Sequence, residues 1–438
     1  MQDFSSGRQS VGAMRIRNVK VFTKNGRFLP GEVRTEGARI KDVLIQGDSQ
    51  LLPEREHPGE KKSLRREYPG GEESPGRARP DGEAYRDAEE CLDGEGGYLL
   101  PGMIDLHFHG CMGADFSDGT LEALRIIAEY EASIGVTAIA PAAMTLPKGQ
   151  LLEILGAAAQ FRRQQLGEEH SLQAELVGVH MEGPFISPVK CGAQDAAYIL
   201  PRSSADFRDF QRAADGLVKL IAIAPEEAAS ESVRDFIGAV GDSAVVSLAH
   251  TNADYQTASK AFLAGASHVV HLYQAMSAFH HRSPGVIGAA ADCPHVTAEL
   301  ICDGVHVHPS MIRAAFSLLG EERMILISDS MRAAGLGDGS YLLGGQEVIV
   351  SGKQARLKKD GSLAGSVTTL PDCVRYAVTR AKIPFETAVA CATMHPAERL
   401  GIEKDYGTIE TGKYADFVIW DKDYALRHVI RHGKRIAR

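Results

Sequence analysis

The chain has 438 residues, a length that predicts one large domain with a smaller partner rather than one simple core. Hydrophobic residues make up 44% and charged residues 24%, which is a globular balance and argues against a disordered or fibrous protein. The net charge of -9 argues against a general nucleic-acid binder, because no broad basic surface is available to meet a phosphate backbone.

The cysteines and the apolar runs indicate the compartment. The seven cysteines are odd in number, scattered and without a CxxC pair, which is typical of reduced thiols in a cytoplasmic protein. No run of eighteen or more apolar residues occurs, and the first twenty residues lack the apolar segment of a signal peptide. We therefore expect a cytoplasmic protein with no membrane partner.

Both ends of the chain predict short strands. Residues 14–47 alternate β-rich pieces with turns, and the Asn25-Gly26 pair is typical of a hairpin. From about Gln50 to Arg86 the chain is crowded with Pro, Gly and charges of both signs, which predicts a flexible insertion. Short alternating strands return near the end. We predict that residues 14–98 and 404–438 together form a small β-sandwich domain, with the insertion at about 50–86.

The middle of the chain, residues 99–403, alternates apolar strand-like runs with helical stretches such as TLEALRIIAEYEASIG. The apolar runs include VTAIAPA, AELVGVHM, LIAIAP, AVVSLAH, HVTAELICDG and MILISDS. Strands that are apolar on both faces and separated by helix-length segments indicate a parallel sheet of βα units. A segment of this size predicts a (β/α)8 TIM barrel as the catalytic domain, in an α/β fold.

Several of these runs end on residues that can bind a metal or titrate. In a barrel, the C-terminal ends of all strands meet at one mouth, so these side chains are expected to lie close together. Two of the histidines are spaced two residues apart, which puts them on one face of a strand. The residues are His107 and His109, His180 and Glu182, His250, His271, His306 and Asp329.

This residue set indicates a metal hydrolase. Imidazole and carboxylate ligands bind a divalent ion and leave a position for water, whose pKa then falls toward ~7. An aspartate beside that water can take its proton and return it to the leaving group. A lone histidine at a strand end is more often structural, but several in successive βα units favour the metal site. Such ligands accept zinc, iron, cobalt or manganese.

Eight motifs carry a resemblance to a known family. In chain order they are PGMIDLHFHG, HMEGPF, LAHTNA, HLYQAM, HHRSPGVIGAA, ICDGVHVHP, ISDSMRAAGL and LAGS, and they span roughly residues 97–420. This series resembles the N-acetylglucosamine-6-phosphate deacetylases of the amidohydrolase superfamily. The resemblance implies hydrolysis of N-acetylglucosamine 6-phosphate to glucosamine 6-phosphate and acetate, in amino-sugar catabolism. It also implies a homodimer in which the neighbouring subunit often helps to hold the phosphate.

The resemblance assigns the metal ligands. Glu182, His250 and His271 match the principal ligands of the family. His107 and His109 match a pair that some members use for a second ion and others lack, so they are either ligands or a hydrogen-bonded pair. We therefore expect a divalent metal, zinc or iron, bound as one ion or two.

The resemblance also assigns the catalytic and substrate-binding residues. Asp329 matches the catalytic acid/base. Arg282 is expected to meet the phosphate, because its planar guanidinium can donate two hydrogen bonds to phosphate oxygens. The alternative is that Arg282 lies in a solvated loop. The chain departs from the family at Gln274, where asparagine is usual, and at Gln194, where histidine is frequent. The predicted substrate contacts are Ala193, Gln274, Ala275, Arg282, His306, Leu363, Ala364 and Gly365.

Two further histidines and two other functions complete the predictions. His180 lies one strand repeat from Glu182 and is expected to orient a ligand, whereas His268 is an odd number of residues from His271 and is expected to serve packing. The same scaffold also suits N-acetylgalactosamine 6-phosphate or an unrelated cyclic amide. A catalytically silent sugar-phosphate-binding protein is the remaining alternative, and the retained metal ligands argue against it.

Overall fold

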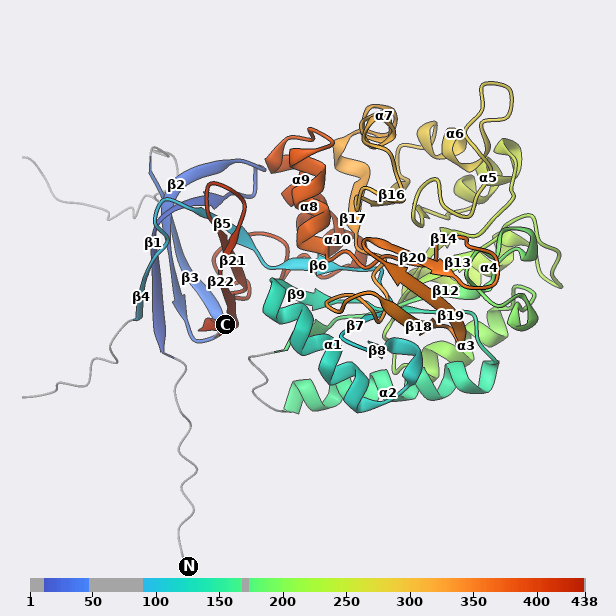
Figure 1. Cartoon of the computed structure of the whole chain (residues 1–438), viewed down its shortest axis with the longest axis horizontal. Coiled ribbons are helices and arrows are strands. Elements are labelled where there is room, and N and C mark those ends of the chain that lie inside the picture. Colours follow the sequence, from blue (N-terminus) through green and yellow to red (C-terminus); the bar gives the residue numbers. More distant parts are fainter. Residues whose placement is uncertain (1–11, 47–89, 168–172, 437–438) are drawn as a thin grey trace, which may run out of the picture.

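The computed structural model describes residues 12–46, 90–167 and 173–436, so the insertion predicted at about 50–86 lies outside the described residues. Figure 1 shows blue N-terminal strands and red C-terminal strands in one domain, and helices around strands in the other. Within the described ranges, no helix combines the length and apolarity that a membrane span requires.

The small domain is one eight-stranded sheet built from both ends of the chain. The N-terminal strands are β1 (Ala13–Phe22), β2 (Phe28–Glu36), β3 (Arg39–Ile45), β4 (Glu90–Asp93) and β5 (Tyr98–Pro101). The C-terminal strands are β21 (Phe417–Trp420), β22 (Leu426–Arg431) and β23 (Lys434–Arg435), and β21 pairs with β5. The predicted Asn25-Gly26 hairpin is confirmed, because it joins antiparallel β1 and β2 and Gly26 has a φ of 67°. The sheet curls around a core that includes Ile16, Leu99 and Phe417.

The large domain is a barrel of parallel strands, which confirms the predicted fold class. The first barrel strand is β6 (Met103–Asp105). Two short segments in succession make the second strand, β9 (Val136–Ile139) with β10 (Ala142–Ala143), and the third, β11 (Glu175–Leu176) with β12 (Val179–Phe185). Then come β13 (Val218–Ile223), β14 (Val245–Leu248), β15 (His268–Val269), β16 (Thr297–Ile301) and β17 (Met324–Ile327). The barrel closes between its last and first strands. There the Asp329 amide, just after β17, donates to the His107 carbonyl, just after β6, at 3.0 Å.

Helices follow the strands and cover the barrel (Figure 1). They are α1 (Leu121–Ile134), α2 (Lys148–Gly167), α3 (Ser204–Ala213), α4 (Val233–Val240), α5 (Tyr255–Leu263), α6 (Gly285–Ala291), α7 (Pro309–Leu319), α8 (Leu370–Thr379), α9 (Phe385–Ala392) and α10 (Met394–Leu400). Side-chain caps fix several starts; Thr120 accepts from the Ala123 amide at the start of α1. Between β17 and α8, an antiparallel sheet of β18 (Gly339–Leu343), β19 (Gln346–Ser351) and β20 (Gln354–Leu357) is inserted.

An ionic cluster joins the two domains. Arg431 in β22 is buried and donates to both carboxylate oxygens of Asp416, at 3.0 and 2.9 Å, and to Glu175 in barrel strand β11 at 2.7 Å. Burial alone would raise the pKa of Glu175, but the imidazole of His432 and the charges of Arg431 and Arg162 hold it well below its ordinary value. The cluster ties the end of the chain to the wall of the barrel.

Candidate active site

Three predicted ligands meet at one point of the barrel mouth. The Glu182 Oε1 atom, in β12, lies 2.8 Å from His250 Nε2 and 3.2 Å from His271 Nε2. The two Nε2 atoms are 3.1 Å apart, and all three side chains are buried. His250 Nδ1 lies 2.9 Å from the Lys190 carbonyl and donates to it, which turns the Nε2 atom toward the carboxylate. The Glu182 oxygen and the two Nε2 atoms would repel one another at these distances unless a proton or a cation lay between them.

The donor set fits a divalent metal ion. Ligand atoms ~2.0–2.1 Å from a tetrahedral zinc ion lie roughly 3.3 Å from one another. The separations among Glu182, His250 and His271 are close to this value, and one carboxylate with two imidazoles is a common set of metal ligands. His107, His109 and Glu182 form a second group of donor atoms within 4.8 Å of one another. The two groups share Glu182, so the residues could hold one ion or two.

Left-handed backbone conformations aim these side chains into the mouth. His250, His271 and Asp329 each follow a strand end and have φ values of 44°, 31° and 47°. A non-glycine residue rarely adopts positive φ, and such conformations concentrate at functional sites because the surrounding structure must hold them. At Asp329 that support is visible, since its amide donates to His107 and its carbonyl accepts from the Ser366 amide at 2.8 Å.

Asp329 faces the metal ligands from the last strand. Its Oδ1 atom lies 3.2 Å from His109 Nε2 and 3.8 Å from His107 Nε2. Both Asp329 Oδ1 and His107 Nε2 are buried without a hydrogen-bond partner, which marks them as atoms facing the site. Burial alone would raise the pKa of Asp329, but the imidazoles of His109 and His107 beside it hold this pKa below its ordinary value. The carboxylate is therefore ionised and able to accept a proton.

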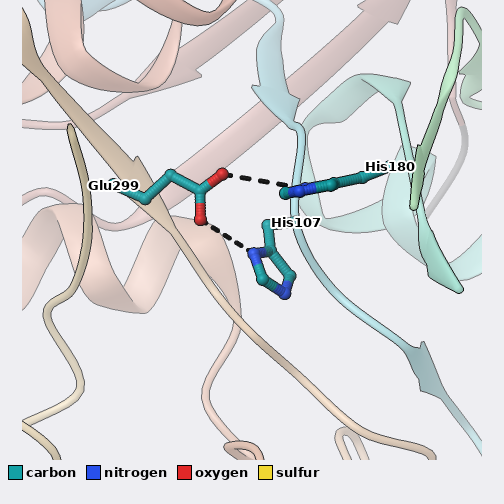
Figure 2. Close-up of side chains that lie close together, drawn as sticks. All are labelled: His107, His180 and Glu299. Atoms are coloured by element: carbon teal, nitrogen blue, oxygen red, sulfur yellow. Dashed lines mark hydrogen bonds and ion pairs between the residues drawn. The ribbon is translucent and has the colours of Figure 1, made fainter. Parts of the chain in front are cut away.

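Behind the ligands lies Glu299, a fully buried carboxylate in β16. Figure 2 shows its two oxygens directed at His107 and His180. The His107 Nδ1 atom is 2.8 Å from Oε2, whereas His180 Nδ1 is 3.7 Å from Oε1 and closer to the Leu106 carbonyl, at 3.3 Å. Burial lowers the pKa of His180 to about 3.

His268 does more than the packing role expected of it. Its Nε2 atom lies 2.9 Å from Glu299 Oε1, on the same carboxylate that contacts His107. The odd spacing from His271 misled the prediction because β15 contains only His268 and Val269, so strand alternation does not extend to His271.

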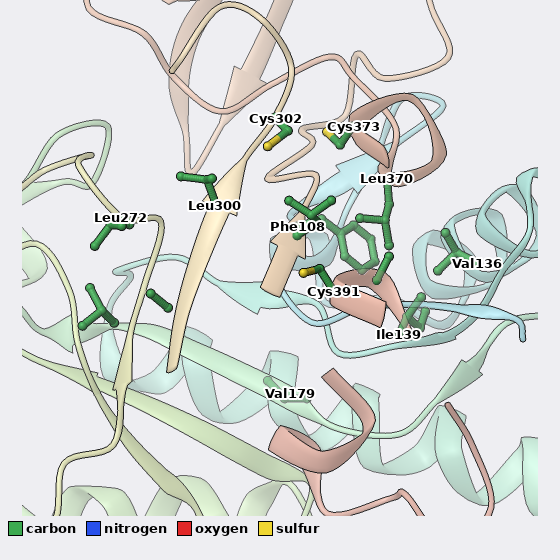
Figure 3. Packing of buried hydrophobic residues seen from close by; sticks show 14 of the residues in the cluster. Phe108, Val136, Ile139, Val179, Leu272, Leu300, Cys302, Leu370, Cys373 and Cys391 are labelled. Atoms are coloured by element: carbon green, nitrogen blue, oxygen red, sulfur yellow. The ribbon is translucent and has the colours of Figure 1, made fainter. Parts of the chain in front are cut away.

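The residue between the two histidines of the HxH pair anchors them from behind. Figure 3 shows Phe108 among buried side chains that include Leu370 and Cys391. His107 and His109 contact Glu182 and Asp329, whereas Phe108 packs into the apolar layer. The seven cysteines are all free, and Cys302, Cys373 and Cys391 belong to this apolar layer rather than to the site.

A pocket opens at the mouth and includes most predicted substrate contacts. Two predicted contacts do not line it: Arg282 is exposed with its guanidinium 2.9 Å from His281, and Ala364 is buried with its amide bonded to the Ala355 carbonyl. The pocket is lined by His109, Met144, Glu182, Gly192, Ala193, Gln194, His250, His271, Gln274, Ala275, His306, Asp329, Leu343, Leu363 and Gly365.

Two polar groups in this pocket are fixed by neighbours. Gln194 donates to Glu182 Oε2 at 2.7 Å and accepts from the Thr145 amide at 2.6 Å, so it orients the carboxylate that both donor groups share. Burial would lower the pKa of His306, but its hydrogen bond to Asp303, at 2.7 Å, raises it. His306 thus lies on the pocket wall with its Nδ1 atom held by Asp303.

Comparison with known proteins identifies the family. The Amidohydrolase family model matches residues 98–436. The N-acetylglucosamine-6-phosphate deacetylase of Bacillus subtilis is 40% identical over 336 residues, which cover 76% of this chain and 83% of that protein. The human enzyme of the same name is 34% identical over 366 residues, covering 81% and 87% of the two chains.

Solved structures give the same result. The chain matches the structure of a mutant N-acetyl-D-glucosamine-6-phosphate deacetylase from Mycobacterium smegmatis in complex with N-acetyl-D-glucosamine-6-phosphate. The TM-score is 0.80 at 26% identity, and the match covers 98% of this chain and 100% of that one. The deacetylase of Thermotoga maritima matches with a TM-score of 0.77 at 27% identity, covering 97% and 100%. The chain therefore belongs to the amidohydrolase family and, within it, to the N-acetylglucosamine-6-phosphate deacetylases.

Proposed function

We propose that this protein hydrolyses N-acetylglucosamine 6-phosphate to glucosamine 6-phosphate and acetate, as a step in amino-sugar catabolism. The observation that carries the proposal is the meeting of Glu182, His250 and His271 at one point of a pocket that also contains Asp329. The relatives named above act on, or bind, this phosphorylated sugar by their names.

The metal would be held by the three buried ligands. Glu182, His250 and His271 would bind a divalent ion, zinc or iron, and His107 with His109 would bind a second one that shares Glu182. When bound, such an ion supplies Lewis-acid activation of a water molecule and of the amide carbonyl.

Asp329 would move the proton. Its ionised carboxylate would accept a proton from the attacking water and then donate it to the departing amine nitrogen, which is general base followed by general acid catalysis. Its unpaired buried Oδ1 atom and its lowered pKa support this role.

The substrate would lie between the loops that close the pocket. Gln274 donates to the His306 carbonyl at 3.3 Å, so these two residues are held together on one wall. His306 would donate to a sugar hydroxyl or to the developing oxyanion. Gly365, at φ 65°, lets the Leu363–Ala364–Gly365 segment approach Asp329, because a Cβ there would lie 3.2 Å from the Asp329 carbonyl.

We further propose a homodimer in which Arg282 acts on the neighbouring subunit's substrate. Arg282 is exposed and does not line its own pocket, so its fork is available to a phosphate held elsewhere. An Arg282→Ala chain mixed with an Asp329→Asn chain tests this, because random re-association makes half of the dimers mixed, each with one intact site. We expect about a quarter of wild-type activity from two inactive parents. No recovery in a dimer shown to exchange subunits would contradict the shared site.

A cytoplasmic location is the last part of the proposal. All seven cysteines are free thiols. Free thiols are typical of a reducing compartment, whereas an oxidising one favours disulfides. Fractionation of the native host with a cytoplasmic marker enzyme measures the location directly.

The reaction is tested by metal analysis together with acetate release. We expect stoichiometric zinc or iron in the purified protein and faster acetate release from N-acetylglucosamine 6-phosphate than from N-acetylgalactosamine 6-phosphate. Bound metal without acetate from either sugar would favour the silent binding protein instead. Equal or reversed rates for the two sugars would overturn the assigned substrate but not the reaction.

A further inference from the structure

Glu299 carries the strongest unassigned interaction in the barrel. Its carboxylate is fully buried and accepts hydrogen bonds from three groups on two segments. The His107 Nδ1 atom lies 2.8 Å from Oε2, the His271 backbone amide lies 3.0 Å from Oε2, and the His268 Nε2 atom lies 2.9 Å from Oε1. A carboxylate with three such donors is fixed in position and stays ionised, and these contacts hold its pKa well below the ordinary value against the effect of burial.

The proton positions around Glu299 follow from these contacts. His268 must place a proton on Nε2, because a lone pair 2.9 Å from a carboxylate oxygen of Glu299 would be repelled, and its Nδ1 can then accept from the Thr297 hydroxyl at 2.6 Å. His107 must likewise place a proton on Nδ1, because a lone pair 2.8 Å from a carboxylate oxygen would be repelled. The Nε2 atom of His107 is then turned toward the metal ligands, 3.7 Å from Glu182 Oε1 and 3.8 Å from Asp329 Oδ1, with no partner of its own.

We propose that Glu299 is a positioning residue that fixes the tautomer of His107 and so presents its Nε2 lone pair to the metal site. The inference rests on the proposed metal-dependent function, but it concerns how the ion is held and not which amide is cleaved. A metal-binding histidine commonly donates its other ring proton to a carboxylate, and loss of such a partner typically costs 10–100-fold in metal affinity.

Two substitutions at Glu299 separate this role from general packing. Glu299→Leu fills the space with an apolar side chain and removes the acceptor for His107. In Glu299→Gln the amide oxygen can still accept from His107 and His271, while the amide nitrogen donates to His268, whose ring then donates from Nδ1 to Thr297. The conservative variant should therefore rescue the tautomer.

The control is Glu131→Gln. Glu131 lies in α1 and is also buried, and burial raises its pKa well above the ordinary value. The substitution thus changes a buried carboxyl of the same kind on the outer helix layer rather than at the strand that faces the histidines.

The readout is zinc titration of the apoprotein against a competing chelator, without substrate. We expect Glu299→Leu to bind zinc 10–100-fold more weakly at the position that uses His107. Glu299→Gln should stay within about threefold of wild type, and Glu131→Gln should be unchanged. In a His107→Gln background, the effect of Glu299→Leu should shrink sharply, because contacting residues that act as a unit are not additive.

Two results would overturn the proposal: zinc affinity of Glu299→Leu equal to wild type, or the same loss with and without His107. Nitrogen NMR of the zinc-loaded wild type provides a test that does not depend on any Glu299 variant folding. We expect a proton on His107 Nδ1, assigned by its absence in His107→Gln, and a proton on Nε2 would refute the positioning role. If the protein releases no acetate but these results hold, the substrate assignment fails while the role of Glu299 stands.

Discussion

Replacing Asp329 with asparagine isolates the proton-transfer step. The substitution changes one carboxylate into an amide of the same shape, and asparagine tolerates the φ of 47° that this position requires. The backbone hydrogen bonds to His107 and Ser366 do not involve the side chain, so the fold and the Glu182, His250 and His271 ligands should remain. What is lost is a proton acceptor 3.2 Å from His109.

The magnitude follows from that loss. Positioned acid–base groups contribute about 10²–10⁴-fold to a rate, which at about 1.36 kcal/mol for each factor of ten is about 2.7–5.4 kcal/mol of transition-state stabilisation. We therefore expect kcat for acetate release to fall by about 10²–10⁴, with metal content unchanged by elemental analysis. The same chemical change at Asp254, an exposed residue that caps α5, is the control, because asparagine caps a helix equally well.

A variant with near-normal rates would remove Asp329 from the proposed mechanism. A variant that lost its metal along with its activity would instead assign Asp329 to metal binding, since the two outcomes differ in metal content.

Three other predictions concern stability. Arg431→Met should lower the free energy of unfolding in urea by about 3–5 kcal/mol, because the buried carboxylate of Asp416 would lose its arginine and Glu175 would lose one of its two arginine partners; a loss below 1 kcal/mol would contradict this role. Glu175 has a lowered pKa, so its stabilisation is present above its ordinary value of 4.5 and is lost as the pH falls below it. Urea unfolding from pH 7 to pH 3 should show this loss in wild type and less of it in Glu175→Gln. Gln194→Leu should cost about 1–3 kcal/mol in the same assay, because the Thr145 amide loses its buried acceptor; unchanged unfolding would mean that water replaces the side chain.

The positions of the barrel and of the ligand residues could be read from the sequence, since both depend on one property of parallel strands. Apolar runs of strand length end on His250 and Asp329, and the carboxyl ends of barrel strands converge whatever the loops do. The prediction therefore needed only the strand ends and not the details of the connections.

Glu299 was missed because its role depends on neighbours far away in sequence. It lies 192 residues from His107, and the sequence shows only an acidic residue inside the apolar run TAELI. That residue was a usable signal, because a glutamate is almost never fully buried unless it is paired. Arg282 is a different case, because it lies in an exposed loop and does not line the pocket.

The contact between Arg431 and Glu175 joins residues 256 positions apart and has a consequence for biosynthesis. A ribosome synthesises the whole barrel before Arg431 leaves the exit tunnel, so during translation Glu175 has Arg162 but not its second arginine partner. The ionic cluster is complete only when the last strands arrive, and nascent chains stalled before Arg431 should be captured by chaperones more often than released full-length chains.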